Sequence, residues 1–260
     1  MQTNFENIEF SVQNKIACIK LNREKAMNAL DDKMTYELSQ ALELCKDSEI
    51  KVVVLTGAGR GFSSGGDIKL MTKLDATPNA LNDLLINLHN VVIQMRNLDK
   101  PIIAGINGFA FGAGFSLALA CDFRVATKNS SYSCAFVNIG LVPDTGASFF
   151  LTKFLGASKA TELMMLGNTI SADEAYNMGL LTKLVEDSEL SEGVMSLASE
   201  LSKKPLGSIS RIKKLVNRAV ISDLSDQLAL EAMYQGEVVK TPDFKEGITA
   251  FMEKRKANFN

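Results

Sequence analysis

Two glycine-rich loops, each next to an apolar run, could present backbone amides to a ligand. The first, residues 57–68 (GAGRGFSSGGDI), holds five glycines and follows the apolar run 52–56. The second, residues 107–116 (NGFAFGAGFS), leads into the apolar stretch 117–120. Glycine lets a backbone approach a ligand without a Cβ in the way. A helix N-terminus adds unpaired N–H donors and about half a positive charge. Both loops therefore suit a phosphate or a carbonyl oxygen that gains negative charge.

The first loop does not match a nucleotide-binding motif. A phosphate-binding P-loop is excluded because no Gly-Lys-Ser/Thr follows the first loop. A dinucleotide fingerprint fails because Phe62 occupies the position of its third glycine. The structural alternative for this loop is an ordinary tight connection.

One carboxylate stands out in the segment 138–148 (NIGLVPDTGAS). Asp144 follows the turn that Pro143 restricts and precedes a predicted helix. It could act as an acid or base, or simply cap that helix. Ser116 does not indicate a serine hydrolase, because the Gly-x-Ser-x-Gly elbow is absent and the single histidine, His89, lies on another predicted helix. His89 borders the apolar stripe of its helix, which favours a structural role.

A repeated strand, loop and helix must position these residues. Residues 8–13 and 16–21 alternate polar and apolar side chains, which predicts a hairpin. Apolar spacing from Asp32 onward predicts a helix that Asp31 or Asp32 caps. The same signals continue along the chain with strands at 52–56, 101–106 and 122–127 and with helices at 81–95 and 112–121. The pattern predicts an α/β fold.

The last part of the sequence is helical throughout. The helical pattern begins near Ser188, and Pro205 and the pair Thr241-Pro242 mark breaks between helices. We therefore expect a core over residues 1–204 and a helical C-terminal module over residues 205–260.

Composition narrows the class of protein. The 260 residues are 46% hydrophobic, with 28 basic and 30 acidic side chains, so a large core is expected and no net field attracts nucleic acid or a membrane. No basic, aromatic-interleaved stripe indicates RNA binding. No run has the length of a membrane span or the form of a signal peptide. Four separated cysteines without a CxxC motif predict a reduced, cytoplasmic location, and one histidine argues against a zinc site.

Several motifs together resemble the enoyl-CoA hydratase/isomerase (crotonase) family. Residues 21–30 (LNREKAMNAL), GRGFSSGGD, NGFAFGAG and IGLVPDTGAS occur in the order typical of that family. Residues 171–175, 178–180 and 251–255 are similar to further landmarks, so the resemblance covers nearly the whole chain. Within the family, the sequence looks most like the single-aspartate enoyl-CoA isomerases of the phenylacetate type.

The resemblance implies a fold, a substrate and an assembly. The fold is a crotonase-like spiral of ββα turns with a helical C-terminal module for oligomerisation, usually in a homotrimer or a dimer of trimers. The substrate is an acyl-CoA thioester, with coenzyme A as part of the substrate and no separate cofactor. In the family two backbone amides hold the thioester oxygen, and the matching positions here are Ser64 and Ala113.

The resemblance also implies site residues. Asp144 matches the catalytic carboxylate of the single-acid members, and residues 71–90 are expected to line the tunnel for the acyl group. Arg23, Lys25 and Lys69 are expected near the CoA phosphates. The residues expected to contact the substrate are Arg23, Lys25, Ala26, Ser63, Gly65, Gly66, Asp67, Ile68, Phe109, Gly112, Gly114, Ser116, Phe136, Phe251 and Lys254.

The sequence departs from the hydratases of the family at their two catalytic glutamates. Ser116 and Phe136 occupy the matching positions, and neither can act as a carboxylate base. Addition of water would lack its usual acid and base. Movement of a double bond from the 3,4 to the 2,3 position needs only one base, so Asp144 favours an isomerase. A hydratase that uses Asp144 alone and a non-catalytic acyl-CoA-binding protein are the alternatives.

Overall fold

The chain opens with the predicted hairpin. The computed structural model describes residues 5–71 and 79–259. Strand β1 (Ile8–Gln13) pairs antiparallel with β2 (Ile16–Leu21), and Asn14 and Lys15 between them adopt left-handed backbone angles of φ 52° and 65°. Two such residues form the tight turn whose twist matches the strands it joins.

A six-stranded sheet runs through the core. Its order is β1-β2-β3-β5-β7-β10, and β1 is the one antiparallel strand among those described. The remaining strands are β3 (Val52–Gly57), β5 (Ile102–Ile106), β7 (Phe123–Thr127) and β10 (Lys183–Val185). The predicted strands at 52–56, 101–106 and 122–127 are confirmed.

A second, smaller sheet, which was not predicted, is formed by strands that alternate along the chain with those of the large sheet. Its order is β4-β6-β8-β9, with β4, β6 and β8 parallel and β9 antiparallel. These strands are three residues long: β4 (Gly61–Ser63), β6 (Phe109–Phe111), β8 (Ser131–Ser133) and β9 (Thr169–Ser171). Because β3, β5 and β7 each lead into a short strand and then a helix, the chain winds as a spiral of ββα turns.

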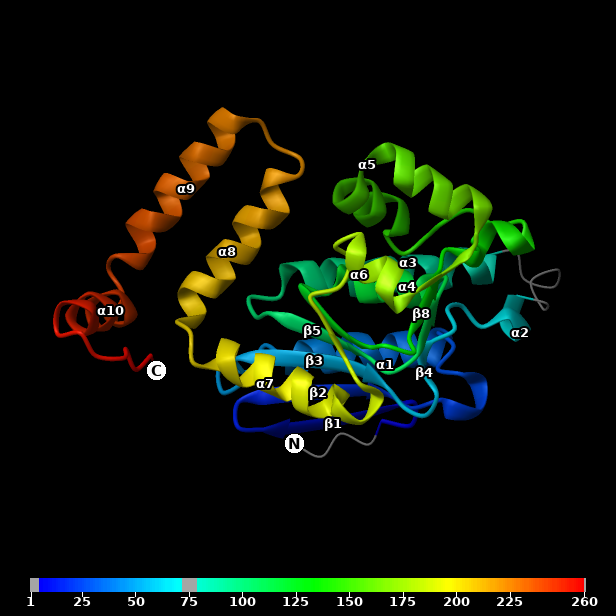
Figure 1. The fold of residues 1–260 in the computed structure, drawn as a ribbon, viewed down its shortest axis with the longest axis horizontal. Coiled ribbons are helices and arrows are strands. Elements are labelled where there is room, and N and C mark those ends of the chain that lie inside the picture. The colour runs from blue at the N-terminus through cyan, green and yellow to red at the C-terminus, as the bar shows by residue number, and fades with distance from the viewer. Residues whose placement is uncertain (1–4, 72–78, 260) are drawn as a thin grey trace.

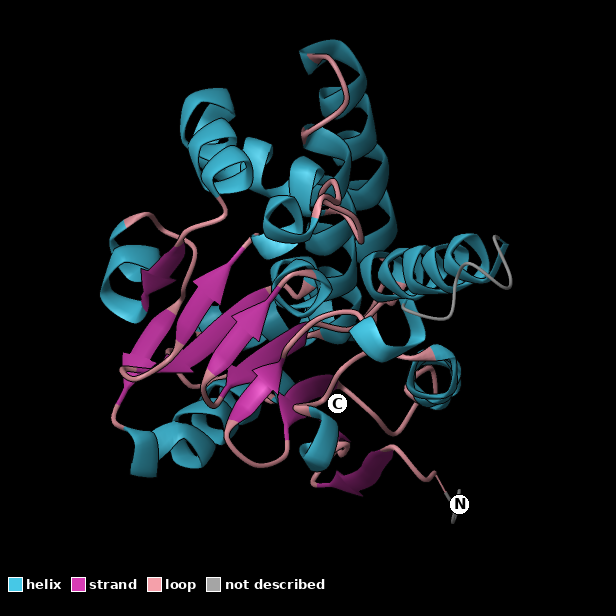
Figure 2. Ribbon diagram, turned by 90° about the vertical axis from the view of Figure 1, so that its right-hand side faces the viewer, coloured by secondary structure: helices cyan, strands magenta, loops and turns pink. Residues whose placement is uncertain are grey.

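Helices cover both faces of the large sheet (Figures 1 and 2). Helices α1, α3 and α4 supply apolar side chains to the core on one face, and α7 packs on the other. The helices of the core are α1 (Asp32–Leu44), α2 (Ile68–Met71), α3 (Asn79–Asn97), α4 (Ala113–Ala120), α5 (Ala147–Leu166), α6 (Ala172–Asn177) and α7 (Leu190–Ser202). Short 3-10 helices are η1 (Glu24–Ala26), η3 (Ala135–Ile139) and η4 (Asp187–Glu189).

The C-terminal helices stand to one side of the core (Figure 1). They are α8 (Leu206–Ala219), α9 (Leu224–Val238) and α10 (Pro242–Met252). Pro205 precedes α8 and Pro242 begins α10, so both predicted breaks between helices are confirmed. Thr241 caps α10. Within residues 5–71 and 79–259, no helix is both long and apolar enough to cross a membrane.

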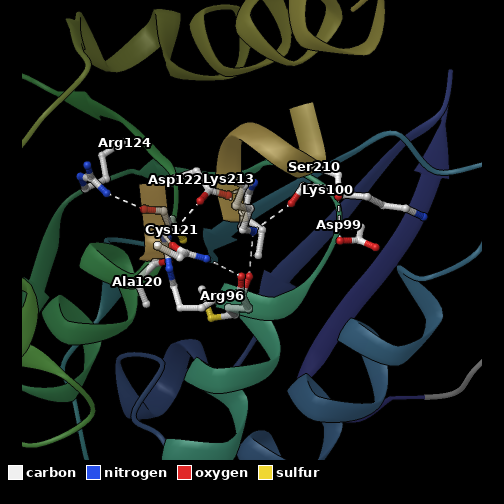
Figure 3. Close-up of polar contacts among 12 residues, drawn as sticks. Arg96, Asp99, Lys100, Ala120, Cys121, Asp122, Arg124, Ser210 and Lys213 are labelled. Carbon is white, nitrogen blue, oxygen red and sulfur yellow. Dashed lines mark hydrogen bonds and ion pairs between the residues drawn. The ribbon is translucent and has the colours of Figure 1, made fainter. Parts of the chain in front are cut away.

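Helix α8 is joined to the core by buried charges (Figure 3). Lys213 Nζ lies 2.9 Å from Asp122 Oδ2 and donates to the Met95 and Lys100 carbonyl oxygens. Ser210 donates to Asp99 at 2.8 Å. Burial lowers the Lys213 pKa, although Asp122 acts in the opposite direction. These contacts fix the point at which the C-terminal helices leave the core.

Candidate active site

A cavity of about 160 Å³ brings together both glycine loops and Asp144. Ser64 and Gly66 line it from the first loop, and Gly112 and Ala113 line it from the second. Its apolar wall comes from α3, α2 and the segment around η3, and consists of Ile68, Leu84, Leu85, Leu88, Ala135, Phe136, Ile139 and Leu141. The part of the expected acyl tunnel at residues 72–78 lies outside the described residues.

The two loops touch each other because glycines occupy the contact. Gly65 has a left-handed φ of 97°, and a Cβ there would lie 2.8 Å from the Phe111 carbonyl oxygen and 3.2 Å from the Ala113 nitrogen. A Cβ on Gly114 would lie 2.6 Å from the Ser63 carbonyl oxygen. Distances below 3 Å are incompatible with a side chain, so both positions require glycine for the loops to converge.

Two amides of the cavity are free to bind an oxygen. Among the described residues, the Gly66 and Ala113 N–H groups have no hydrogen-bond partner, and Ala113 begins helix α4. The Ser64 amide, which the sequence suggested as the first donor, instead donates to the Met27 carbonyl oxygen at 3.0 Å. The free amide of the first loop is therefore that of Gly66, two residues after the predicted Ser64.

Asn28 holds the first loop in place, a role that the sequence analysis missed. Its side-chain amide donates to the Ala58 and Gly61 carbonyl oxygens at 2.9 and 3.0 Å, and its side-chain oxygen accepts from the Arg23 amide. Ser63 Oγ donates to the Asn28 carbonyl oxygen at 2.8 Å. Asn28 adopts φ 54°, and asparagine tolerates this left-handed region better than most residues. An asparagine within the motif 21–30 was the available signal.

Asp144 does not cap the helix that follows it. Helix α5 begins at Ala147 with Gly146 as its N-cap and no side-chain cap. The Asp144 carboxylate accepts instead from the Thr145 hydroxyl, with Thr145 Oγ1 2.8 Å from Asp144 Oδ1. The capping alternative is therefore wrong, and the acid is available for chemistry.

The pKa of Asp144 is raised above that of an ordinary aspartate. The largest cause is burial, which disfavours the charged form, while the Thr145 hydrogen bond and the nearby His89 both lower the pKa. A raised pKa makes the carboxylate a stronger base. His89 itself is exposed on α3.

Ser116 and Phe136 lie beside Asp144 but neither is acidic. Phe136 lines the cavity and is 6% exposed. Ser116 is fully buried, and its hydroxyl donates to the Asp144 carbonyl oxygen at 3.0 Å. The two positions that match the hydratase glutamates thus hold a phenyl ring and a hydroxyl that contacts the backbone of the acid.

Arg23 is held by other groups of the protein. Its guanidinium lies 3.0 Å from Asp67 and 3.1 Å from Asp31, and it donates to the Ala29 carbonyl oxygen. Lys25 and Ala26 line a separate depression of about 450 Å³. Asp67, which was also predicted to contact the substrate, accepts hydrogen bonds from Arg23 and from the Lys69 amide.

Two predicted contact residues lie away from the cavity within one chain. Phe251 and Lys254 are at the end of α10, which Figure 1 shows across the molecule from α2. Phe251 is 79% exposed. Phe109 packs against Phe111, with ring centroids 5.7 Å apart, and against the backbone of Gly61. Within the described residues, no group of three or more His, Cys, Asp or Glu side chains could hold a metal ion.

Comparison with known proteins gives the family. The family described as enoyl-CoA hydratase/isomerase matches residues 11–260. The chain belongs to the enoyl-CoA hydratase/isomerase family. It is 34% identical to the crotonyl-CoA hydratase of Syntrophomonas wolfei, over 98% of both chains. It is also 34% identical to the 1,2-epoxyphenylacetyl-CoA isomerase of Escherichia coli K12, over 95% of this chain and 96% of the relative.

Solved structures agree with this membership. An enoyl-CoA hydratase from Polaromonas sp. JS666 superimposes with a TM-score of 0.94 and 32% identity, over 97% of this chain and 99% of that one. The expected crotonase-type α/β spiral with C-terminal helices is confirmed. The protein is an enzyme of the enoyl-CoA hydratase/isomerase family, and its relatives include both hydratases and isomerases.

Proposed function

We propose that this protein is an enoyl-CoA isomerase that moves a 3,4 double bond to the 2,3 position, with Asp144 as its single acid and base. One observation carries the proposal. Among the described residues that line the cavity, Asp144 is the only carboxylate, and it shares the cavity with the two free amides of Gly66 and Ala113. Ser116 and Phe136 replace the two glutamates on which the family's hydratases depend.

The reaction needs one proton to be moved. Asp144 removes it from C2 of the 3-enoyl thioester. The C–H electron pair then forms a C1–C2 double bond, and the π electrons of the carbonyl group move to its oxygen, which gives a dienolate. Return of the proton to C4 re-forms the carbonyl and leaves the double bond between C2 and C3. Because the same proton is removed and returned, a single carboxylate can serve both steps.

The negative charge that develops on the thioester oxygen makes the main contribution to the activation free energy. The Gly66 and Ala113 amides supply two preorganised donors, and each such donor is typically worth roughly 3–4 kcal/mol. The N-terminus of α4 adds the positive end of a helix dipole at the same place. Burial of Asp144 raises its pKa and so strengthens the base.

Further parts of the proposal concern substrate binding and assembly. The coenzyme A portion of the substrate lies near Lys25 and Ala26, and no separate cofactor is needed. Exposed apolar side chains on the C-terminal helices, such as Leu228 and Ile248, support a homotrimer or a dimer of trimers built through residues 205–260. A cytoplasmic location fits the four cysteines, since no two of them are paired among the described residues.

Conversion of 3-enoyl-CoA to 2-enoyl-CoA tests the function directly. The wild-type protein should catalyse it, and Asp144→Asn should lower the rate by about 10²–10⁴-fold, the range for loss of an acid–base group. Asp173→Asn, at an exposed aspartate on α6, is the control and should keep the wild-type rate. An Asp144→Asn variant with full activity would contradict the proposal.

Two further assays on the wild-type protein distinguish the isomerase from the two alternative functions. The crotonyl-CoA hydratase among its relatives makes hydration the second candidate. Hydration of crotonyl-CoA faster than isomerisation would favour it. Tight binding of a CoA ester without solvent-deuterium exchange at C2 would indicate a non-catalytic acyl-CoA-binding protein.

A further inference from the structure

Thr145, next to the acid, adopts an unfavourable backbone conformation. Its φ is 53°, in the left-handed region, although it is β-branched and only 1% exposed. Such an outlier is rare for a branched residue and persists only where the surrounding structure enforces it. A smaller or more tolerant residue would fit the backbone better, so the threonine side chain itself needs an explanation.

The side chain of Thr145 explains the conformation. Its hydroxyl donates to Asp144 Oδ1 at 2.8 Å, from inside the protein, where little water competes. A hydroxyl donor stabilises the charged carboxylate and opposes the effect of burial. It also occupies Oδ1, which leaves Oδ2 as the oxygen available to carry a substrate proton.

A second hydroxyl holds the backbone of the same residue. Ser116 Oγ lies 3.0 Å from the Asp144 carbonyl oxygen and 3.2 Å from the Gly112 carbonyl oxygen. The Gly112 oxygen also accepts the Ser116 amide at 3.1 Å, and the Asp144 oxygen is the nearer acceptor for the hydroxyl. Ser116 lies one turn after Ala113 on α4 and thus links the acid to the helix that presents a free amide.

Two other titratable groups face Asp144 among the described residues. His89, on α3, lowers the Asp144 pKa and is the third cause, after burial and Thr145. Cys134 precedes η3, and burial, with a contribution from Asp144, raises its pKa to about 12. The thiol therefore stays protonated near neutral pH and does not compete as a base.

We infer that Thr145 and Ser116 are positioning residues for Asp144. Thr145 fixes the carboxylate so that Oδ2 alone exchanges the proton with the substrate, and Ser116 fixes the backbone of the acid relative to the Ala113 amide. This inference rests on the proposed isomerase function. It adds a reason for the serine at a position where hydratases carry a glutamate.

The pair Thr145→Val and Thr145→Ser tests the role of the first hydroxyl. Valine keeps the shape and removes the donor, whereas serine keeps the donor. We expect Thr145→Val to lower kcat for 3-enoyl-CoA by about ten- to a hundredfold, since small misplacement of a catalytic group has effects of this order. KM should stay within about twofold, because ground-state binding is unchanged.

The pH profile distinguishes positioning from packing. Without the donor the Asp144 pKa rises, so the acidic limb of kcat should move to higher pH in Thr145→Val and return in Thr145→Ser. If Thr145→Val does not fold, Thr145→Ala removes the same donor and should move the limb in the same direction. An unmoved limb with wild-type kcat, or equal losses in the valine and serine variants, would overturn the role of Thr145.

Ser116→Ala tests the second hydroxyl. It should lower kcat by roughly tenfold without moving the acidic limb, because its partner is a backbone carbonyl rather than the carboxylate. Wild-type kcat in this variant would overturn the role of Ser116. The wild type and Asp144→Asn together distinguish failure of the proposed function from failure of the positioning role. Absence of 3-enoyl-CoA conversion by the wild type refutes the isomerase function, and full activity in Asp144→Asn refutes Asp144 as its acid and base. An inactive Asp144→Asn beside an unaffected Thr145→Val refutes only the positioning role.

Discussion

The two ends of helix α4 differ in whether their backbone groups have hydrogen-bond partners. At the N-terminus, the Ala113 amide has no partner among the described residues and lines an apolar cavity. At the C-terminus, Arg96 donates to the Ala120 carbonyl oxygen at 2.9 Å and Arg124 donates to that of Cys121 at 2.6 Å (Figure 3). The cations sit where the helix dipole is negative.

Helix α4, which is eight residues long, therefore has one end that can bind a ligand and one end that is anchored to the core. The C-terminal end is linked through Asp122 to Arg96 and Lys213, and Arg124 donates to backbone carbonyl groups there. The N-terminal end leaves donors unused, and a substrate oxygen can use them. A helix that is firmly held at one end can keep free amides in a fixed position at the other, which is what preorganised stabilisation of an oxyanion requires.

Removal of the acid at the C-terminal end should have the largest effect on stability. Asp122→Ala leaves Lys213 buried and Arg96 partly buried without their carboxylate, and loss of one partner from such a group destabilises by about 3–5 kcal/mol. Urea denaturation measures this change. The kcat of the folded protein should remain within about twofold, because Arg96 and Arg124 still hold the carbonyl groups at the C-terminal end of α4. An unchanged unfolding midpoint would contradict the anchoring role.

A side chain between the two loops should damage catalysis at the N-terminal end. In Gly114→Ala the new Cβ would collide with the Ser63 backbone and push the Gly66 and Ala113 amides apart. We expect kcat to fall by about 10²-fold, as for loss of one oxyanion donor. Gly236→Ala, on α9 with open space around its Cβ, is the matched control and should keep full activity. Full activity in Gly114→Ala would argue against convergence of the loops.

The charge of Asp144 should lower stability at neutral pH, in contrast with the paired charges at the other end. Burial raises its pKa above the ordinary 3.8, so the folded state binds the proton more tightly than the unfolded state. Stability from this group is therefore present at low pH and lost as pH rises through the folded pKa. Asp144→Asn should melt higher than wild type near pH 7 and equally below about pH 4. A lower melting temperature for Asp144→Asn at neutral pH would contradict this.

An exposed ion pair should matter least. Lys46 and Glu43 lie 2.6 Å apart on the surface, with side chains 60% and 51% exposed. Glu43→Gln should change the free energy of unfolding by less than about 1 kcal/mol, because water already solvates both charges. A decrease in the free energy of unfolding as large as that of Asp122→Ala would mean that burial does not determine how much these charges contribute to stability.

Much of the fold could be predicted because it depends on near neighbours. The hairpin turn at Asn14 and Lys15 and the cap of α1, where Asp31 accepts from the Met34 amide at 2.8 Å, are short-range effects. The breaks at Pro205 and Pro242 follow from the geometry of proline. The short strands of the second sheet were missed because three residues carry too little alternation to be recognised.

The sequence by itself determined the family, the two glycine loops and the lone acid, because residue types at set spacings carry that information. Only the tertiary structure decided which amide is free, since Ser64 is engaged by Met27, a residue far back in the chain. It also decided that the Thr145 hydroxyl faces the acid and that Phe251 lies away from the cavity in the same chain. Hydrogen bonds between distant segments depend on how the whole chain packs, and local sequence patterns do not encode them.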